Sequence, residues 1–304
     1  MGDGEAGGGR LAALLPLFRE LGDLKRIRSA GAPGSVAERL FARAWAALSR
    51  GEPAREVMRR TTAAALAAAR LGDMDLASLQ DLGLSAAQAD AVLRRSVDEV
   101  SGPLDSSLVD DLKAALAAGA PEAGSGPDFV DRLARQPRAG VTCPGRPRLL
   151  LQPPESHAEH CLMVAVLGVL ASPGEGADPT QAFVAGLAHH LHNVFMPDSG
   201  FTGEVLLGEH LDPVIARTRE RALGELAPDV ADRVRAALAP IGGDATPEAR
   251  AFHIADVLDR VLEIEQHLKA ARVSLDDVLG PYALVHDGPV KPLHDAILRE
   301  AGLQ

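Results

Sequence analysis

The chain has 304 residues, of which 46% are hydrophobic, so it can bury a sizeable core and is not an intrinsically disordered protein. Its formal net charge of -11 at pH 7 argues against nucleic acid and anionic membrane surfaces as partners. The two cysteines make no disulfide framework, and the acidic, glycine-rich start has no signal-peptide pattern. We therefore expect a cytoplasmic protein without a membrane span.

Helical patterns follow one another through the first half of the chain. Alanine and leucine dominate its apolar residues and aromatic residues make up only 3%, which favours closely packed helices and predicts an all-α fold. Ser35 followed by Glu38 has the form of a capping box. Helical periodicity predicts helices over 11–21, 35–48, 55–71, 85–100 and 107–118.

A stretch rich in glycine, proline and arginine, residues 118–154, interrupts the helical patterns and has room for one short helix. We interpret it as a linker with a domain boundary near residue 140, which divides the chain into a helical domain, 10–140, and a second domain, 141–304. Helices are predicted in the second domain over 156–171, 180–192, 211–225, 229–239, 247–271 and 290–301.

The two halves align without a gap when residues 34–48 are placed over 155–169. Ser35 then falls on Ser156 and Glu38 on Glu159. The polar residues of the second half, however, meet Arg39 and the Ala68-Ala69 pair in the first. Either two alanine-rich helices align by chance, or the chain is an internal duplication in which only the C-terminal copy kept site residues.

Three segments of the second half carry polar residues that a plain helical core would not need: ESHAEH at 155–160, LAHHLHN at 187–193 and HIADVLDRVLE at 253–263. In order and approximate spacing they resemble the HD-domain superfamily. Its members are helical, metal-dependent phosphohydrolases with one histidine, then a His-Asp pair, then a distant aspartate. The resemblance implies an HD-domain-like helical bundle, and with the internal alignment it implies two tandem HD-like halves, the N-terminal one without ligands.

By this resemblance the metal ligands are His160, His189, His190 and Asp256, with His190 in the place of the paired aspartate. Asn193 stands where the nucleotidase-like subgroup keeps an acid, and Asp198 matches a second acid of that subgroup. The implied catalytic residues are therefore Asp198, which would orient or deprotonate the attacking water, and Asn193, which would hydrogen-bond to it.

Three imidazoles and one carboxylate suit a divalent transition metal (Mn, Fe, Co, Ni or Zn) better than Mg. They leave one positive charge on the ion, so such a site favours anions. The expected function is hydrolysis of a phosphomonoester, for example a nucleotide, by metal-bound water, with a small anionic phosphate-bearing molecule as the substrate.

Two other functions stay open. The loss of the paired aspartate and of the nearby acid also fits a catalytically inactive HD-fold interaction or regulatory protein, whose N-terminal half would serve packing or the contacts of a homodimer. A diiron HD-type oxygenase is the other alternative. It would use His210 and would need one further ligand.

Several other polar residues are assigned no ligand role. We expect His157, His192 and His253 to be structural. The literal His-Asp pairs at 286–287 and 294–295 lie in a turn and near the C-terminus, away from the motif order. In the arginine-rich stretch, Arg146 and Arg148 are the candidates for attracting a substrate phosphate, although a solvated linker is the simpler interpretation.

Overall fold

The computed structural model describes residues 8–268 and 274–304, and within these ranges the protein is helical with no β-strand, which confirms the predicted all-α class. None of the helices in these ranges is both long enough and apolar enough to span a bilayer. The helices are α1 (Gly8–Gly22), α2 (Val36–Ser49), α3 (Ala54–Leu71), α4 (Leu76–Asp81), α5 (Ala86–Val100), α6 (Ser106–Ala115), α7 (Asp128–Arg135), α8 (His157–Glu175), α9 (Pro179–Ala188), α10 (Gly200–Leu207), α11 (Leu211–Leu223), α12 (Pro228–Leu238), α13 (Pro247–Leu268), α14 (Leu275–Leu279) and α15 (Lys291–Glu300).

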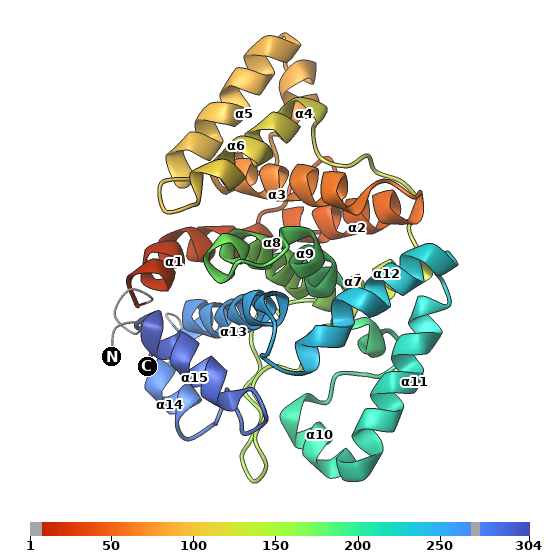
Figure 1. Ribbon diagram of the computed structural model, residues 1–304, viewed down its shortest axis with the longest axis vertical. Coiled ribbons are helices and arrows are strands. Elements are labelled where there is room, and N and C mark those ends of the chain that lie inside the picture. The colour runs from red at the N-terminus through yellow and green to blue at the C-terminus, as the bar shows by residue number, and fades with distance from the viewer. Residues whose placement is uncertain (1–7, 269–273) are drawn as a thin grey trace.

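Helices α8 and α9 form the central layer of the molecule. Figure 1 shows them between α2 and α3 on one side and α13 on the other, and these pairs pack directly against one another. Helices α4, α5 and α6 extend beyond α3, whereas α10 and α11 lie at the opposite end of the molecule. The site residues predicted from the sequence lie on α8 and α13 or in the segment between α9 and α10.

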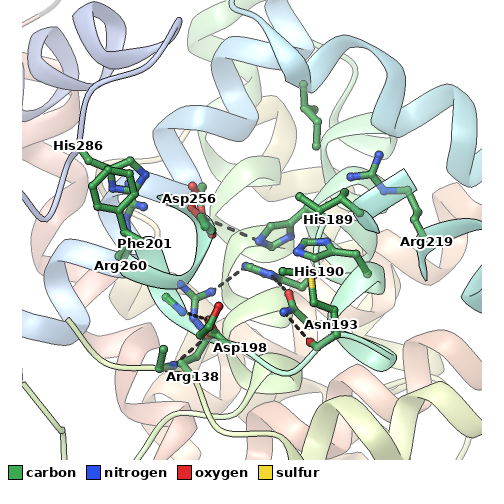
Figure 2. Close-up of a pocket in the computed structure, with 18 of the residues that line it drawn as sticks. Arg138, His189, His190, Asn193, Asp198, Phe201, Arg219, Asp256, Arg260 and His286 are labelled. Carbon is green, nitrogen blue, oxygen red and sulfur yellow. Dashed lines mark hydrogen bonds and ion pairs between the residues drawn. The ribbon is translucent and has the colours of Figure 1, made fainter. Parts of the chain in front are cut away.

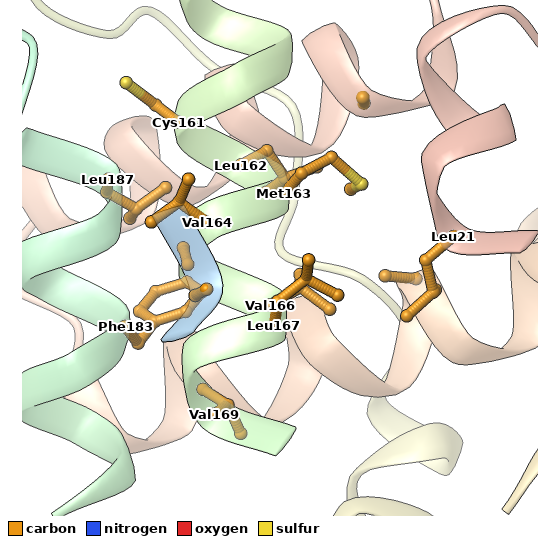
Figure 3. Close-up of a cluster of buried hydrophobic side chains, with 14 of the residues drawn as sticks. Leu21, Cys161, Leu162, Met163, Val164, Val166, Leu167, Val169, Phe183 and Leu187 are labelled. Carbon is orange, nitrogen blue, oxygen red and sulfur yellow. The ribbon is translucent and has the colours of Figure 1, made fainter. Parts of the chain in front are cut away.

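Helix α8 is buried on all its faces, as expected of a helix at the centre of a bundle. Every residue from His157 to Ser172 is buried, and Figure 3 shows its apolar side chains reaching toward α9 on one side and Leu21 on the other. Its first turn is held by a capping box, in which Ser156 Oγ accepts from the Glu159 backbone N–H and the Glu159 carboxylate accepts from that of Ser156. This cap fixes the helix start, and therefore the position of His160 one turn later.

Most predicted helices are present, including one in the linker, α7, and the capping box predicted at Ser35 is confirmed. The prediction was wrong at 180–192, because α9 ends at Ala188 and the chain continues through a 3₁₀ turn, Leu191–Val194. Helices α4, α10 and α14 were not predicted. They are five to eight residues long, too short to show a clear periodicity. Residues 269–271 of the predicted helix 247–271 lie outside the described residues.

One hydrophobic core includes residues from both sides of the boundary predicted near residue 140. Helix α1 packs against α13 and α15, and α2 packs against α8, so helices of the ranges 10–140 and 141–304 share this core. The helix pairs that the internal alignment equates, α2 with α8 and α3 with α9, lie against each other. A duplication remains a prediction.

The contact between α8 and α9 depends on a glycine. A Cβ atom placed on Gly186 would lie 2.5 Å from both the Ala165 Cα and the Ala165 backbone nitrogen. Backbone atoms cannot move aside as a flexible side chain would, so we expect Gly186→Ala to lower the free energy of unfolding by about 1–3 kcal/mol in urea titrations.

Gly168 provides the matched control, because a Cβ there would meet Ala182 at an ordinary 3.6 Å. Gly168→Ala should leave stability unchanged or raise it, since alanine also has the higher helix propensity. Equal losses of stability in the two variants would contradict the close approach at Gly186.

Candidate metal centre

A cavity of about 650 Å³ opens between α11, α12, α13 and the segment that follows α9, a volume in the range of small-molecule sites. The ends of several elements meet there, so side chains distant in sequence face one space. Figure 2 shows His189, His190 and Asp256 at its centre, with Arg138, Asn193 and Asp198 beside them. The cavity therefore contains most of the residues that the sequence singled out.

The four predicted ligands come together at one wall of the cavity. His160 Nε2 lies 3.1 Å from His189 Nε2 and 3.2 Å from Asp256 Oδ1, and His189 Nε2 lies 3.8 Å from the same carboxylate oxygen. One ring nitrogen each of His160, His189 and His190 lies within 4.8 Å of the other two. Ligand atoms about 2.0–2.2 Å from one ion stand roughly 3.0–3.5 Å apart, so these side chains fit a metal ion with little rearrangement.

Each of the three imidazoles is oriented by a hydrogen bond at its other nitrogen. Nδ1–H of His160 donates to Asp259 Oδ2 at 2.7 Å, that of His189 to the Gly186 carbonyl at 2.7 Å, and that of His190 to Asn193 Oδ1 at 2.7 Å. In a neutral ring such a bond selects the tautomer in which Nε2 carries the lone pair. An acceptor on Nδ1 is the usual companion of a metal-binding histidine.

The electrostatic environment favours the ligand forms of three of the four groups. Burial, together with the neighbouring imidazoles, lowers the pKa of His189 and of His190 well below the ordinary value. Burial alone would raise the pKa of Asp256, but His160 and Arg260 hold it well below its usual range. His189 and His190 are thus neutral and Asp256 is ionised at neutral pH.

His160 differs, because two carboxylates flank its ring. Burial and the charge of Arg138 alone would lower its pKa, but Asp256 and Asp259 raise it. Burial raises the pKa of the neighbouring Cys161 thiol far above its ordinary value, so the free thiol is not ionised at neutral pH.

Arg138 and Asn193 complete the surroundings of His190. Arg138 Nη1 donates to His190 Nε2 at 2.8 Å, so a cation at that nitrogen would replace the guanidinium. The amide orientation of Asn193 is fixed by its Nδ2, which donates to the Met196 carbonyl at 3.1 Å and leaves Oδ1 as the acceptor for His190. Asn193 thus positions His190 in this structure.

Asp198 lies on the cavity wall and is held by the backbone. Its two oxygens accept from the N–H groups of Ala139 and Gly200, each at 2.9 Å, and Oδ2 lies 3.5 Å from His157 Nε2. Burial alone would raise its pKa, but His157 and Arg138 hold it well below its ordinary value. Asp198 is therefore an ionised, fixed hydrogen-bond acceptor at neutral pH.

Behind His160 lies a second cluster that could hold a cation, Glu155, His160 and Asp259. A lysine from the N-terminal half occupies it. Lys25 Nζ lies 2.5 Å from Glu155 Oε1, 2.7 Å from Asp259 Oδ1 and 3.4 Å from Glu263 Oε2, and the residue is only 4% exposed. The ammonium group already supplies the cation that these carboxylates need.

The remaining histidines take the structural roles predicted for them or lie away from the centre. His157 Nδ1–H donates to the Gln136 carbonyl at 3.0 Å, and His253 bonds to the Gly243 carbonyl at 3.0 Å. His192 lines the cavity with its ring centroid 5.5 Å from that of His190, and His210 is exposed and outside the cavity. His286, one of the literal His-Asp pairs, does reach the cavity, where it stacks on Phe201.

Sequence reasoning chose the wrong arginines for the cavity. Arg146 lies over the Tyr282 ring and Arg148 donates to backbone carbonyls, and neither lines the cavity. Arg138, Arg219 and Arg260 do. Arg138 belongs to the same arginine-rich stretch, and Arg260 lies one helical turn after Asp256, so a search for residues on the same helix face would have found it.

Asp259 was also missed, although it follows Asp256 by three residues on the same helix. No local signal marks Lys25 or Arg219.

Comparison with known proteins gave no match: none of the family models, curated proteins or solved structures that were searched matches this chain.

Proposed function

We propose that this protein is an HD-type, metal-dependent hydrolase of a phosphomonoester, with His160, His189, His190 and Asp256 as the metal ligands. One observation carries the proposal. Three imidazoles have Nδ1 bound to a protein acceptor, and their remaining nitrogens cluster beside the carboxylate of Asp256. A buried lone pair costs free energy unless a donor or a cation meets it, and one metal ion would meet the lone pairs of all three rings at once.

The donor set indicates which ion the centre takes. Imidazole suits Mn, Fe, Co, Ni or Zn better than Mg, and one carboxylate leaves a net positive charge that attracts an anionic substrate. When bound, such an ion supplies a water molecule of lowered pKa and polarises a phosphoryl oxygen.

The chain's own residues would bind and orient the reactants. Asp198 stays ionised and accepts a hydrogen bond from the attacking water, which directs its lone pair. Asn193 keeps the Nε2 lone pair of His190 directed at the centre. Arg138 places a positive charge beside the same wall, where the developing negative charge of the phosphoryl group would lie.

A catalytically inactive, regulatory protein of the same fold is the second candidate, and one contact favours it. The Arg138 guanidinium meets the lone pair of His190, so this part of the cluster is satisfied without an ion. No comparable observation favours a diiron oxygenase, since Lys25 fills the second cluster and His210 is exposed.

Metal analysis and a phosphatase screen distinguish the two candidates. We expect the purified protein to bind about one Mn, Fe, Co, Ni or Zn ion per chain and to hydrolyse phosphomonoesters, nucleoside monophosphates included, with loss of activity in EDTA and recovery on adding metal. Full occupancy without turnover of any phosphomonoester would remove the catalytic part of the proposal. Failure to bind any of these ions would remove the metal centre itself and favour the regulatory protein.

A further inference from the structure

The arginines that line the cavity differ in how their charges are balanced. Burial alone would lower the pKa of Arg138, but Glu155, Asp198 and Asp256 raise it, so its charge is compensated inside the protein. Burial lowers the pKa of Arg219 and of Arg260, and their neighbouring carboxylates do not make up the difference. The positive charges of these two guanidinium groups, which line one cavity, are thus not fully compensated by the carboxylates that the structure describes.

Within residues 8–268 and 274–304, the hydrogen bonds also indicate that Arg219 and Arg260 lack partners. The buried Nε of Arg219 and that of Arg260 have no hydrogen-bond partner among the described residues. No carboxylate of those residues lies within 4.0 Å of either guanidinium, although most other arginines of the chain are paired. A partly buried, unpaired guanidinium facing a cavity is a fitting partner for an oxyanion, which it can bind through two parallel N–H groups.

The two arginines act on different residues of the cavity. Arg260 follows Asp256 by one turn of α13, and its charge contributes to lowering the pKa of that carboxylate. Arg219 belongs to α11, and its charge acts on His192 instead. In Figure 2 the two appear on opposite sides of His189 and His190, so one group on the substrate could not occupy both places.

We propose that the substrate carries two anionic groups: the phosphate to be hydrolysed, bound beside Asp256 by Arg260, and a second phosphate or carboxylate, bound by Arg219. This inference rests on the proposed function and narrows its substrate class. Arg219 then selects among phosphomonoesters and takes no part in the reaction itself.

Matched pairs of substrates test this assignment. D-glycerate 3-phosphate and glycerol 3-phosphate differ in one carboxylate, and adenosine 3′,5′-bisphosphate and adenosine 5′-monophosphate differ in one phosphate. We expect Arg219→Gln to raise KM about 10- to 100-fold for the member of a pair with the second anion, with kcat and the other member little changed. Arg260→Gln should impair both members equally. The substrate pair in which Arg219→Gln raises KM for only one member identifies the second anion as carboxylate or phosphate.

Two controls keep these effects specific. Arg219→Lys retains the charge and should recover part of the loss, and Arg233→Gln, at an exposed position of α12 outside the cavity, should change neither KM. The same KM change for both members of each pair, or none for any, would overturn the assignment of Arg219.

A binding measurement separates this inference from the proposed function. Calorimetry on EDTA-treated protein should show tighter binding of the doubly anionic probe than of its partner, and Arg219→Gln should abolish the difference. If that difference is found while no phosphomonoester is hydrolysed, the hydrolase proposal fails and the assignment of Arg219 stands. If phosphomonoesters are hydrolysed but the two probes bind alike, the assignment fails and the hydrolase proposal stands.

Discussion

His189→Ala is expected to abolish both metal binding and phosphomonoester hydrolysis. His189 Nε2 lies 3.1 Å from His160 Nε2 and 3.8 Å from Asp256 Oδ1. Without it, two imidazoles and one carboxylate remain, and a divalent ion loses a ligand that water must replace. We expect metal content to fall from about one ion per chain to near zero and activity to fall about a thousandfold or more.

His210→Ala is the matched control, because it removes an imidazole that is exposed and lies outside the cavity. Metal content by mass spectrometry and the rate of phosphate release should be unchanged in that variant. Far-UV circular dichroism of both proteins should match the wild type, since His189 lies after the last residue of α9. Retention of a full metal complement in His189→Ala would show that the ion binds elsewhere in the protein.

The sequence pattern singled out the four residues proposed as ligands but could not show that they converge. His160, His189 and Asp256 were found because motif order and spacing resemble a known family. Their approach to within 3–4 Å depends on the packing of α8, α9 and α13, a tertiary arrangement that no helical periodicity encodes.

The helix end at Ala188 illustrates a second limit. The sequence after His190 continues with apolar residues at helical spacing, and Leu191 and Val194 are in fact buried. Periodicity therefore extends the predicted helix to residue 192, whereas the chain turns after His189, so that His189 and His190 both reach the cavity. Burial patterns alone do not distinguish a helix from a 3₁₀ turn that buries the same side chains.

The orienting groups behind the ligands show what could and could not have been predicted. Asp259 shares a helix face with Asp256, so helical geometry alone could have suggested that it supports a ligand. Lys25 has no such signal. Its partners Glu155 and Glu263 follow it by 130 and 238 residues, and the sequence around Lys25 shows only a charged turn after a helix.

Lys25→Met should cause the largest loss of stability among single substitutions at the site. The methionine is of similar length and apolar, but it leaves the buried carboxylates of Glu155 and Asp259 without the ammonium group, whereas Glu263 keeps its pair with Arg26. Breaking a buried ion pair in this way costs about 3–5 kcal/mol of unfolding free energy at pH 7. Lys291→Met, which removes a partly exposed pair with Asp295, should cost less than about 1 kcal/mol.

The pH dependence of this loss identifies its cause. In the wild type, burial alone would raise the pKa of Asp259 and of Glu263, but Lys25 and their other partners lower both, so their contribution to stability is present above the unfolded pKa of about 4 and is lost as the pH falls further. In Lys25→Met the pKa of Asp259 should rise above the unfolded value, because Lys25 no longer offsets burial, whereas His267 and Arg26 still lower the pKa of Glu263. The folded variant then takes up protons as the pH falls. The difference in unfolding free energy between the variant and the wild type should therefore shrink from pH 7 to pH 5.

The same variant also tests how the N-terminal half supports the metal centre. Lys25 holds the carboxylate of Asp259, and Asp259 accepts the Nδ1–H of His160, so loss of the ammonium should loosen the orientation of that ligand. We expect metal affinity, measured by competition with a chelator at a temperature where the variant is folded, to weaken about 10- to 100-fold.

Adding Glu155→Gln to Lys25→Met should recover part of the stability, because one uncompensated charge is removed, but should recover less of the metal affinity, because Asp259 still lacks its partner. A Lys25→Met protein as stable as the wild type at pH 7, with unchanged metal affinity, would mean that the carboxylates around Lys25 are protonated or solvated, and that the chain does not use this buried lysine to orient His160.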